Sequence, residues 1–371
     1  MRQITVMIKP ASSLCNMRCK YCFYADVSAR RQIPSFGVMK PELTQKIVDN
    51  ILADLEPGDT LTLAFQGGEP TLAGLDYFEH TTAYLTRSCG SGITVRYALQ
   101  TNGYTLNESW CAFLKSHHFL VGLSLDADAA LHNANRLNTL GSGTFSRVLE
   151  SKRLLEQSGI DYNVLMVLTR EFARHPQRVW NFIQKEHIRY VQFIPCLGEM
   201  NGSRTQYSLQ PALFASFYNT LFDLWYSEFC SGHYISVNLF DNLIQLLATG
   251  KCGACGLIGA CQPQIVVESD GSVYPCDFYA TDPYKLGNLA ESRLRLLFES
   301  VNMSAFLNRP KQSDVLCETC TYRSICGGGC ARMFREVCCQ TENNGFCGYR
   351  LFLEHTLPRI QHIALQMSFR V

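Results

Sequence analysis

From the start of the chain to about residue 235, short runs rich in β-branched and aromatic residues alternate with longer amphipathic segments. This alternation is typical of βα units, which build a parallel sheet. Helices are predicted between the strands, including residues 41–55, which begin with a proline suited to a first helical turn, and residues 146–157. The six predicted strands favour an α/β fold in the form of a partial (β/α)6 barrel. They cover residues 5–9, 61–65, 95–100, 121–125, 161–168 and 190–194.

Distinctive motifs follow four of these strands at the point where each strand ends. The cysteine-rich loop 15–22 follows the first strand, and the Gly-Gly-Glu-Pro sequence of residues 67–70 follows the second. The Thr-Asn-Gly sequence of residues 101–103 follows the third strand, and Asp126 follows the fourth. Because barrels of this kind carry their chemistry on loops at the carboxyl ends of the strands, we expect these motifs to form one site.

The first of these loops contains Cys15, Cys19 and Cys22 in the spacing C-x3-C-x2-C. Three thiolates can hold a four-iron cluster and leave one iron without a protein ligand, so that this iron is open to a substrate. The alternatives are a zinc knuckle or a disulfide framework. Zinc needs a fourth ligand nearby, and the neighbouring Lys, Tyr and Phe side chains cannot serve.

The cysteine spacing resembles that of the radical S-adenosylmethionine (SAM) superfamily. This resemblance implies that the amino and carboxylate groups of SAM bind the open iron, and that one electron cleaves SAM to a 5'-deoxyadenosyl radical. It also implies that loop 67–70 binds the SAM amino group, with its glycines allowing close approach. The alternative for this loop is an ordinary βα turn. The candidate cofactor-binding residues are Tyr21, Gln66, Gly67, Gly68, Glu69, Ser124 and Arg136.

Two residues near this site have alternative interpretations. Arg136 could pair with the SAM carboxylate through a bidentate fork, or it could be a solvated surface arginine. Tyr24 could cover the adenine with its ring, or it could pack beneath the cluster loop. If Tyr24 is buried, its hydroxyl needs a polar partner.

Composition limits the partners and the compartment. The chain has 371 residues, a net charge of +1 and 18 cysteines. A nearly neutral chain gives no electrostatic reason to expect nucleic acid or an anionic membrane as partner. The N-terminus lacks the apolar core of a signal peptide, and no stretch approaches the roughly 20 apolar residues that cross a bilayer. We therefore expect a cytoplasmic protein whose cysteines bind metal rather than form disulfides.

The character of the chain changes after about residue 235, and 11 of the 18 cysteines lie beyond position 250. We therefore predict two domains, residues 1–235 and 236–371. The second domain has one clear strand pair, residues 264–268 and 273–276, joined by an Asp-Gly sequence that favours a tight turn. Residues 349–367 are predicted to form a closing helix. So little regular structure suggests that bound metal stabilises this domain.

Eight cysteines of the second domain are enough for two fully ligated four-iron clusters. Their pattern resembles the SPASM extension of radical SAM peptide-modifying enzymes. By that resemblance one auxiliary cluster takes Cys255, Cys261, Cys276 and Cys330, and the other takes Cys317, Cys320, Cys326 and Cys347.

Alternatives to this ligand set remain. Spacing cannot choose between Cys252 and Cys255, or between Cys347 and its competitors Cys338 and Cys339. A pair of zinc ribbons is the alternative for the whole domain. The other cysteines are predicted to be small buried hydrophobic residues, among them Cys89, Cys111, Cys196 and Cys230.

A carboxylate, Asp277, directly follows Cys276. A base beside an electron acceptor is useful because a carbon radical next to sulfur or oxygen is oxidised more easily as it loses the thiol or hydroxyl proton. The alternative is a solvated loop aspartate that caps a turn.

Here the resemblance narrows to the anaerobic sulfatase-maturating enzymes and runs nearly end to end. It rests on residues 9–13, 15–24, 65–74, 100–103 and 267–279. It implies three [4Fe-4S] clusters and SAM as cofactors, and it makes Asp277 the base. Tyr24 is the second candidate catalytic residue. The family often continues its fourth strand with Asp-Gly-Pro, whereas this chain has Asp126-Ala127-Asp128, and residues 198–207 do not align clearly.

The expected function is the oxygen-independent oxidation of a cysteine or serine in a sulfatase motif to Cα-formylglycine. The expected partners are an unfolded sulfatase polypeptide and an electron donor such as flavodoxin or ferredoxin. One rival is a SPASM enzyme that cross-links or epimerises a ribosomal peptide. A rival of another class is a non-catalytic iron-sulfur electron carrier or zinc-ribbon scaffold.

Overall fold

The computed structural model describes residues 1–309, 315–340 and 345–368. The chain divides into two compact units, each built from several stretches of sequence. Unit 1 comprises Met1–Leu125, His132–Tyr162 and Pro263–Arg309, and unit 2 comprises Asp126–Leu131, Asn163–Gln262 and Pro310–Val371. Because both units take residues from either side of position 235, they do not test the predicted domain boundary, which stays a prediction.

Unit 1 contains a mixed sheet with the strand order β10-β9-β8-β1-β2-β3-β4. The pairs from β1 to β4 are parallel, β8 is also parallel to β1, and β9 runs antiparallel to β8 and β10. The predicted strands of this part of the chain are confirmed. Their bounds are Gln3–Ile8 (β1), Thr60–Phe65 (β2), Thr94–Thr101 (β3), Leu120–Ser124 (β4), Ile265–Val267 (β8), Ser272–Tyr274 (β9) and Gly287–Asn288 (β10).

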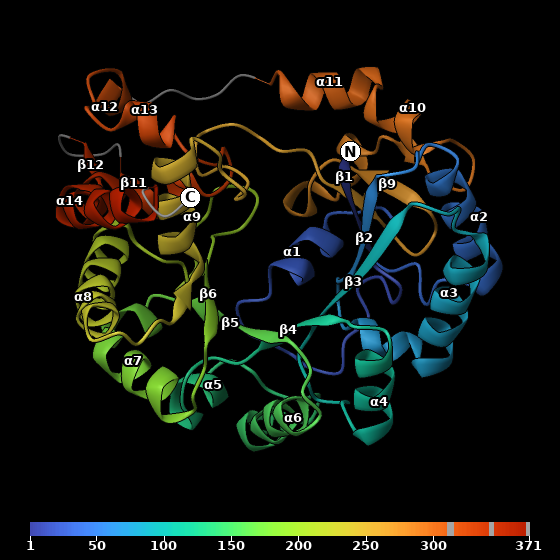
Figure 1. Ribbon diagram of the computed structural model, residues 1–371, viewed down its shortest axis with the longest axis horizontal. Coiled ribbons are helices and arrows are strands. Elements are labelled where there is room, and N and C mark those ends of the chain that lie inside the picture. The colour runs from blue at the N-terminus through green and yellow to red at the C-terminus, as the bar shows by residue number, and fades with distance from the viewer. Residues whose placement is uncertain (310–314, 341–344, 369–371) are drawn as a thin grey trace. The chain divides into compact units, whose positions relative to one another are not determined.

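The helices of unit 1 bury apolar stripes at helical spacing. Pro41 occupies the first turn of α2, as predicted, and the helix buries Ile47, Val48 and Ile51. It lies beside α3 (Figure 1). The bounds are Phe23–Ala29 (α1), Pro41–Leu52 (α2), Leu75–Ser88 (α3), Glu108–Ser116 (α4), Phe145–Gln157 (α6), Leu294–Phe298 (α10) and Val301–Leu307 (α11). The short helix α5 covers Ala129–Asn133.

The predicted strand pair of residues 264–268 and 273–276 is confirmed as the hairpin of β8 and β9, which joins the sheet of unit 1. Its turn contains Gly271 at φ +85°, a left-handed conformation that glycine adopts without strain. Asp270 accepts hydrogen bonds from the Ser272 backbone N–H and hydroxyl, which close the turn. In the β1–β8 register Ile8 pairs with Val267, so the residues that follow them leave the sheet side by side.

Unit 2 is built on the parallel strands β5, β6 and β7, with helices α7, α8, α9 and α14. Helix α14 confirms the predicted closing helix and packs along α8 and α9 (Figure 1). Phe217, Tyr218, Phe240 and Phe352 form part of the aromatic core between these helices. The bounds are Tyr162–Leu168 (β5), Tyr190–Pro195 (β6), Ser236–Val237 (β7), Cys339–Gln340 (β11), Phe346–Cys347 (β12), Pro176–Lys185 (α7), Pro211–Cys230 (α8), Asn238–Thr249 (α9), Val315–Glu318 (α12), Arg323–Cys326 (α13) and Gly348–Ser368 (α14).

The four cysteines predicted to be buried hydrophobic residues do not all behave alike. Cys111 and Cys196 are buried and Cys89 is half-buried, whereas Cys230 is exposed. The prediction for Cys230 is wrong because this residue ends α8 at a surface turn. Within the described ranges, no helix is both long and apolar enough to cross a membrane.

Candidate active site

The segment of residues 12–22, which contains the cysteine loop 15–22, is fixed by backbone hydrogen bonds to two other loops of unit 1. The N–H groups of Gly68 and Glu69 donate to the carbonyls of Ser12 and Leu14 at 2.9 and 2.8 Å. On the other side, the N–H groups of Arg18 and Lys20 donate to the carbonyls of Leu137 and Asn135 at 2.7 and 3.1 Å. The loop therefore meets both the Gly-Gly-Glu-Pro motif and the segment that carries Arg136.

The two glycines of residues 67–70 are required by contacts within the protein. A Cβ on Gly68 would lie 2.1 Å from the carbonyl oxygen of Leu14, where no side chain fits. Gly67 has φ +125°, and a Cβ there would lie 3.0 Å from the Cγ of Lys9. The glycines thus let three chain segments approach one another, and their predicted contact with SAM stays a prediction.

The thiols of Cys15, Cys19 and Cys22 are half-buried on this one loop. Cys15 Sγ accepts weak hydrogen bonds from the Met17 N–H at 3.4 Å and from Asn102 Nδ2 at 3.8 Å. Burial is the main cause that raises the pKa of the Cys15 thiol to about 11. Three soft sulfur donors on a short, braced loop match the donor set of an iron-sulfur cluster with one open iron.

Zinc fits these cysteines less well. Among the side chains that the structure describes, no three His, Cys, Asp or Glu residues are placed to hold one metal ion. The thiolates of a cluster bind different irons, so they stand farther apart than ligands around a single ion. The assignment of Cys15, Cys19 and Cys22 to a cluster rests on their number and spacing in the sequence.

Glu69 is completely buried, and its carboxylate points toward protein partners. Its Oε1 accepts hydrogen bonds from the hydroxyls of Thr71 and Thr101, both at 2.7 Å, and from the Thr71 N–H at 3.2 Å. Its Oε2 accepts from the Asn102 N–H at 2.7 Å. Burial raises the pKa of Glu69, although these donors oppose the shift. Glu69 therefore ties the loop after β2 to the end of β3.

Arg136 is buried, so its interpretation as a solvated surface arginine is wrong. Only 6% of the residue is exposed, and the guanidinium lies over the ring of Tyr21 at 5.5 Å. The position follows from the backbone contact between residues 135–138 and the cysteine loop. Two predicted cofactor-binding residues are thereby brought together, while Ser124 ends β4 half-buried.

Asp277 lies within a cluster of polar side chains and is not a solvated turn residue. Its Oδ2 accepts a hydrogen bond from the Tyr24 hydroxyl at 2.6 Å and one from Gln66 Nε2 at 3.2 Å. Gln66 also donates to the Tyr24 oxygen at 2.6 Å. Burial, followed by the negative charge of Asp277, raises the pKa of Tyr24 well above its usual value, so the phenol stays protonated. Both predicted catalytic residues and Gln66 form one hydrogen-bonded group.

Three charged residues beneath this group were missed by the sequence prediction. Lys9 Nζ lies 2.7 Å from Asp277 Oδ1 and 3.6 Å from Glu268 Oε1, and Arg31 lies 2.6 Å from the same Glu268 oxygen. Burial would raise the pKa of Glu268, but Lys9 and Arg31 lower it overall. A signal was present in the sequence, since Lys9 and Glu268 are each the last residue of a predicted strand. The pairing of those strands was not predicted.

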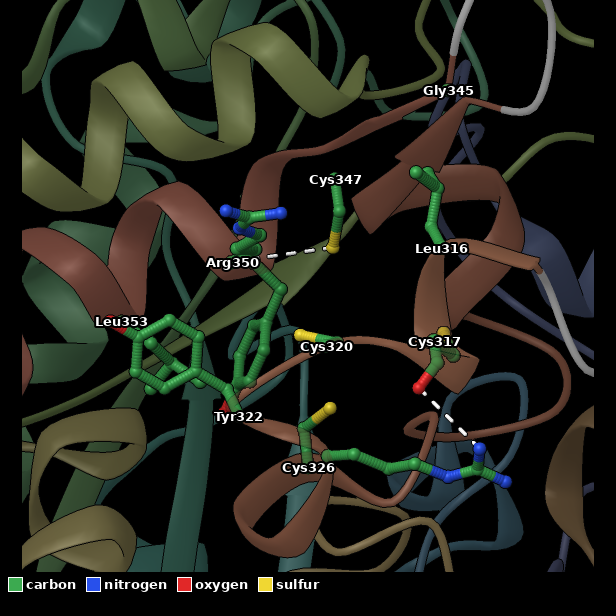
Figure 2. Close-up of a pocket in the computed structure, with 11 residues that line it drawn as sticks. Leu316, Cys317, Cys320, Tyr322, Cys326, Gly345, Cys347, Arg350 and Leu353 are labelled. Atoms are coloured by element: carbon green, nitrogen blue, oxygen red, sulfur yellow. Dashed lines mark hydrogen bonds between the residues drawn. The ribbon is translucent and has the colours of Figure 1, made fainter.

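In unit 2, four of the predicted cluster ligands lie around one pocket (Figure 2). Cys317, Cys320, Cys326 and Cys347 line it together with apolar and aromatic side chains such as Leu316 and Tyr349. Gly345 lies in the same wall, where a Cβ would meet the Leu316 side chain at 2.7 Å. Four converging cysteines in a largely apolar pocket fit a fully ligated cluster.

The competitors of Cys347 do not line this pocket. Cys339 pairs with Cys347 across the β11–β12 ladder, and Cys338 is buried. A hydrogen bond with Cys339 lowers the pKa of Cys347 to about 7 although burial opposes the shift, whereas burial raises the pKa of Cys338 well above its usual value. The position of Cys347 in the wall of the pocket favours it as the ligand.

The four cysteines predicted to bind the other auxiliary cluster are divided between the two units. Cys255, Cys261 and Cys330 belong to unit 2, and Cys276 belongs to unit 1. Within unit 2 a Cβ on Gly256 would lie 2.6 Å from Cys330 Cβ, so the segment after Cys255 packs directly against Cys330. Cys255 is exposed and Cys252 is half-buried, so the choice between them stays a prediction.

The loop after β4 has Asp126-Ala127-Asp128 in place of the Asp-Gly-Pro that the family resemblance implies, and both of its carboxylates have structural partners in unit 2. Asp126 is buried and accepts a hydrogen bond from the Val167 N–H at 2.9 Å. Asp128 accepts hydrogen bonds from the Nε and Nη2 atoms of Arg178, one at each carboxylate oxygen. Ala127 between them has φ +39°, where glycine is normally favoured.

Sequence comparisons place both parts of the chain. Residues 10–183 match the radical SAM superfamily, and residues 246–321 match the SPASM iron-sulfur cluster-binding domain. A protein of Clostridium novyi (strain NT) described as a cysteine-type anaerobic sulfatase-maturating enzyme is 38% identical over 374 residues, which cover 100% of both chains. A serine-type anaerobic sulfatase-maturating enzyme of Klebsiella aerogenes is 30% identical over 355 residues, covering 95% of this chain and 85% of the relative.

A solved structure gives the same result for the fold. The structure described as native anSMEcpe with bound AdoMet and Kp18Cys peptide superposes with a TM-score of 0.90 at 36% identity, covering 98% of this chain and 99% of that chain. The match confirms the predicted fold class, a partial radical SAM barrel with a C-terminal SPASM domain. The two domains also account for the predicted cofactors, [4Fe-4S] clusters and SAM. The chain belongs to the anaerobic sulfatase-maturating enzymes, a family of radical SAM oxidoreductases that carry a SPASM domain.

Proposed function

We propose that this enzyme oxidises a cysteine or serine in a sulfatase polypeptide to Cα-formylglycine without molecular oxygen. The observation that carries the proposal is the group formed by Asp277, Tyr24 and Gln66, in which a carboxylate directly follows a candidate cluster ligand, Cys276. Relatives over the full length of the chain that are described as sulfatase-maturating enzymes support this substrate class.

The cofactor sites follow from the residues brought together in unit 1. Cys15, Cys19 and Cys22 would hold the cluster with the open iron. The SAM site would be built from residues on the surrounding loops: Tyr21, Gln66, Gly67, Gly68, Glu69, Ser124 and Arg136. Because the Glu69 carboxylate is engaged with the end of β3, we assign Glu69 to holding the loop. When bound, these groups supply a 5'-deoxyadenosyl radical that removes one hydrogen from Cβ of the target residue.

Asp277 is the base that takes the proton of the target thiol or hydroxyl. Its Oδ1 is buried against Lys9, which leaves Oδ2 as the accepting atom. The 3.2 Å bond from Gln66 is the longer of the two at Oδ2, so we expect it to be displaced by the incoming donor. Tyr24 keeps its short bond and orients the carboxylate.

The overall reaction balances. Loss of a hydrogen atom, a proton and an electron converts the CH2–SH group of cysteine to a thioaldehyde, and hydrolysis then releases sulfide and leaves formylglycine. The electron needs an acceptor, and the cysteine sets of the SPASM domain would hold it as two further clusters. The ligands would be Cys255, Cys261, Cys276 and Cys330 for one cluster, and Cys317, Cys320, Cys326 and Cys347 for the other.

Two further parts of the proposal concern the surroundings of the enzyme. A low-potential one-electron donor such as flavodoxin or ferredoxin would reduce the first cluster. The cytoplasm would keep the cysteine ligands reduced. Nucleic acid and membranes are not expected as partners of a chain with a net charge of +1.

The test is product identity. The anaerobically purified, reduced enzyme is incubated with SAM and an unfolded peptide that carries the Cys-x-Pro-x-Arg motif, and the peptide mass is followed. Formation of formylglycine together with 5'-deoxyadenosine is expected. Release of 5'-deoxyadenosine with a thioether-bridged or epimerised peptide would instead support the rival peptide maturase.

A further inference from the structure

We propose that Lys9, Glu268 and Arg31 are positioning residues that fix the orientation of the Asp277 carboxylate. This inference rests on the proposed function, because it concerns the residue assigned there as the base. None of the three is required to contact the substrate, SAM or a cluster.

The pairing of β1 with β8 places Lys9 and Glu268 side by side. Strand β1 ends at Ile8, and its parallel neighbour β8 ends at Val267, with these two residues in register. The Lys9 N–H donates to the Val267 carbonyl at 2.8 Å, which continues the ladder by one residue. The ammonium and the carboxylate are therefore held at the ends of adjacent strands and do not depend on flexible loops.

Positive and negative side chains alternate next to Asp277. Arg31, Glu268, Lys9 and Asp277 form a chain of alternating sign with separations of 2.6, 3.6 and 2.7 Å. The side chains of Arg31, Glu268 and Lys9 are at most 2% exposed, and that of Asp277 is 9% exposed. Buried charges persist only when they are paired, so each member holds the next in place.

Lys9 itself has little freedom to move, because both its stem and its ammonium are in contact with other residues. Its aliphatic stem packs against the backbone at Gly67, where any side chain would collide with it. Its ammonium lies 4.7 Å from the centre of the Tyr24 ring, within the range of a cation–π contact. Lys9 thus contacts both the base and the tyrosine that donates to the base.

Together these contacts fix both oxygens of Asp277. Lys9 contacts Oδ1 as an ion pair, and Tyr24 and Gln66 donate hydrogen bonds to Oδ2, so rotation of the carboxylate would break contacts at both oxygens. A base acts efficiently only when it is within hydrogen-bond reach of its proton. Loss of Lys9 should leave the base present but poorly aimed.

The experiment measures formylglycine formed per 5'-deoxyadenosine released, using the reduced holoenzyme and the cysteine peptide. The main variant is Lys9→Met combined with Glu268→Gln, which removes one positive and one negative charge and leaves the buried chain neutral. Glu268→Gln alone is a milder variant of nearly identical shape. The matched control is Lys152→Met, which removes an equally buried lysine from its ion pair with Glu156 on α6.

We expect the double variant to lower this ratio about tenfold. This is less than the roughly 100-fold or greater loss expected when a general base is removed altogether. Glu268→Gln should lower it by a smaller factor, and Lys152→Met should leave it unchanged. KM for the peptide should stay constant in all variants, because the buried chain would affect the proton transfer and not peptide binding.

A double variant or a Glu268→Gln variant that folds, binds wild-type amounts of iron and keeps the wild-type ratio would overturn the inference. A rise in KM at constant kcat would also overturn it, because it would place these residues in substrate binding. If the wild-type enzyme releases 5'-deoxyadenosine without formylglycine, the proposed function fails first, and that result is distinct from either outcome above.

Discussion

Replacing Glu69 by glutamine tests how the Gly-Gly-Glu-Pro loop is held in place. The carboxylate accepts hydrogen bonds at both oxygens, three at Oε1 and one at Oε2. Glutamine can keep its oxygen toward the threonine donors, but its amide NH2 then faces the N–H of Asn102. Two donors cannot satisfy each other, so one buried N–H loses its partner.

The loss of stability in Glu69→Gln follows from these two facing donors. Leaving a buried donor unsatisfied costs about 1–3 kcal/mol. For a chain of 371 residues each kcal/mol lowers the melting temperature by about 1.3 °C, so Glu69→Gln should lower it by about 1–4 °C. Thr101→Val removes another donor of the same network and should act in the same direction.

The assay is anaerobic thermal unfolding of the two variants beside Glu42→Gln, an exposed glutamate in the first turn of α2. We expect the control to unfold within about 1 °C of the wild type, because surface substitutions change stability by less than about 0.5 kcal/mol. If Glu69→Gln unfolds with the control while SAM affinity falls sharply, Glu69 acts on the cofactor directly and its assignment to loop support is wrong.

Three further predictions concern single groups. Tyr24→Phe removes a hydrogen bond to a charged acceptor and should slow formylglycine formation about 10-fold or more. Replacement of another buried tyrosine, Tyr77→Phe, should leave the rate of formylglycine formation unchanged. Equal rates for the two variants would contradict the role given to Tyr24. The pKa of Glu268 lies below its ordinary value of 4.5, so its contribution to stability is present above that value and is lost as the pH falls through the folded-state pKa. The difference in thermal unfolding between Glu268→Gln and the wild type should therefore be largest at pH 7 and shrink only as the pH falls below 4.5, and a constant difference would refute this assignment. Cys347→Ala should lose about four of roughly twelve irons and Cys339→Ala none, as measured by iron and sulfide analysis; the opposite result would exchange their roles.

Local pattern was sufficient to predict most of the secondary structure. The six strands and the helix at Pro41 follow from period and composition, because each depends on residues close in sequence. The Asp-Gly turn predicted the β8–β9 hairpin for the same reason. The predicted helix of residues 41–55 proved shorter at its C-terminal end, where the structure ends α2 at Leu52.

Contacts between distant segments were harder to predict. Tyr24 and Asp277 are 253 residues apart in sequence, and their hydrogen bond depends on the pairing of β1 with β8. The motif resemblance identified both residues and also included Lys9, but it assigned Lys9 no role. The burial of Arg136 likewise depends on contact between residues 135–138 and the cysteine loop.

The central claim is that hydrogen abstraction and proton removal are separate tasks, and that Asp277 performs the second. It is tested with a peptide carrying two deuterium atoms on Cβ of the target cysteine, comparing the wild type with Asp277→Asn. The wild type should transfer deuterium to 5'-deoxyadenosine and form formylglycine in equal amounts. The variant should still transfer deuterium while formylglycine falls by about 100-fold or more. Undiminished formylglycine in Asp277→Asn, or 5'-deoxyadenosine without deuterium in the wild type, would contradict the account.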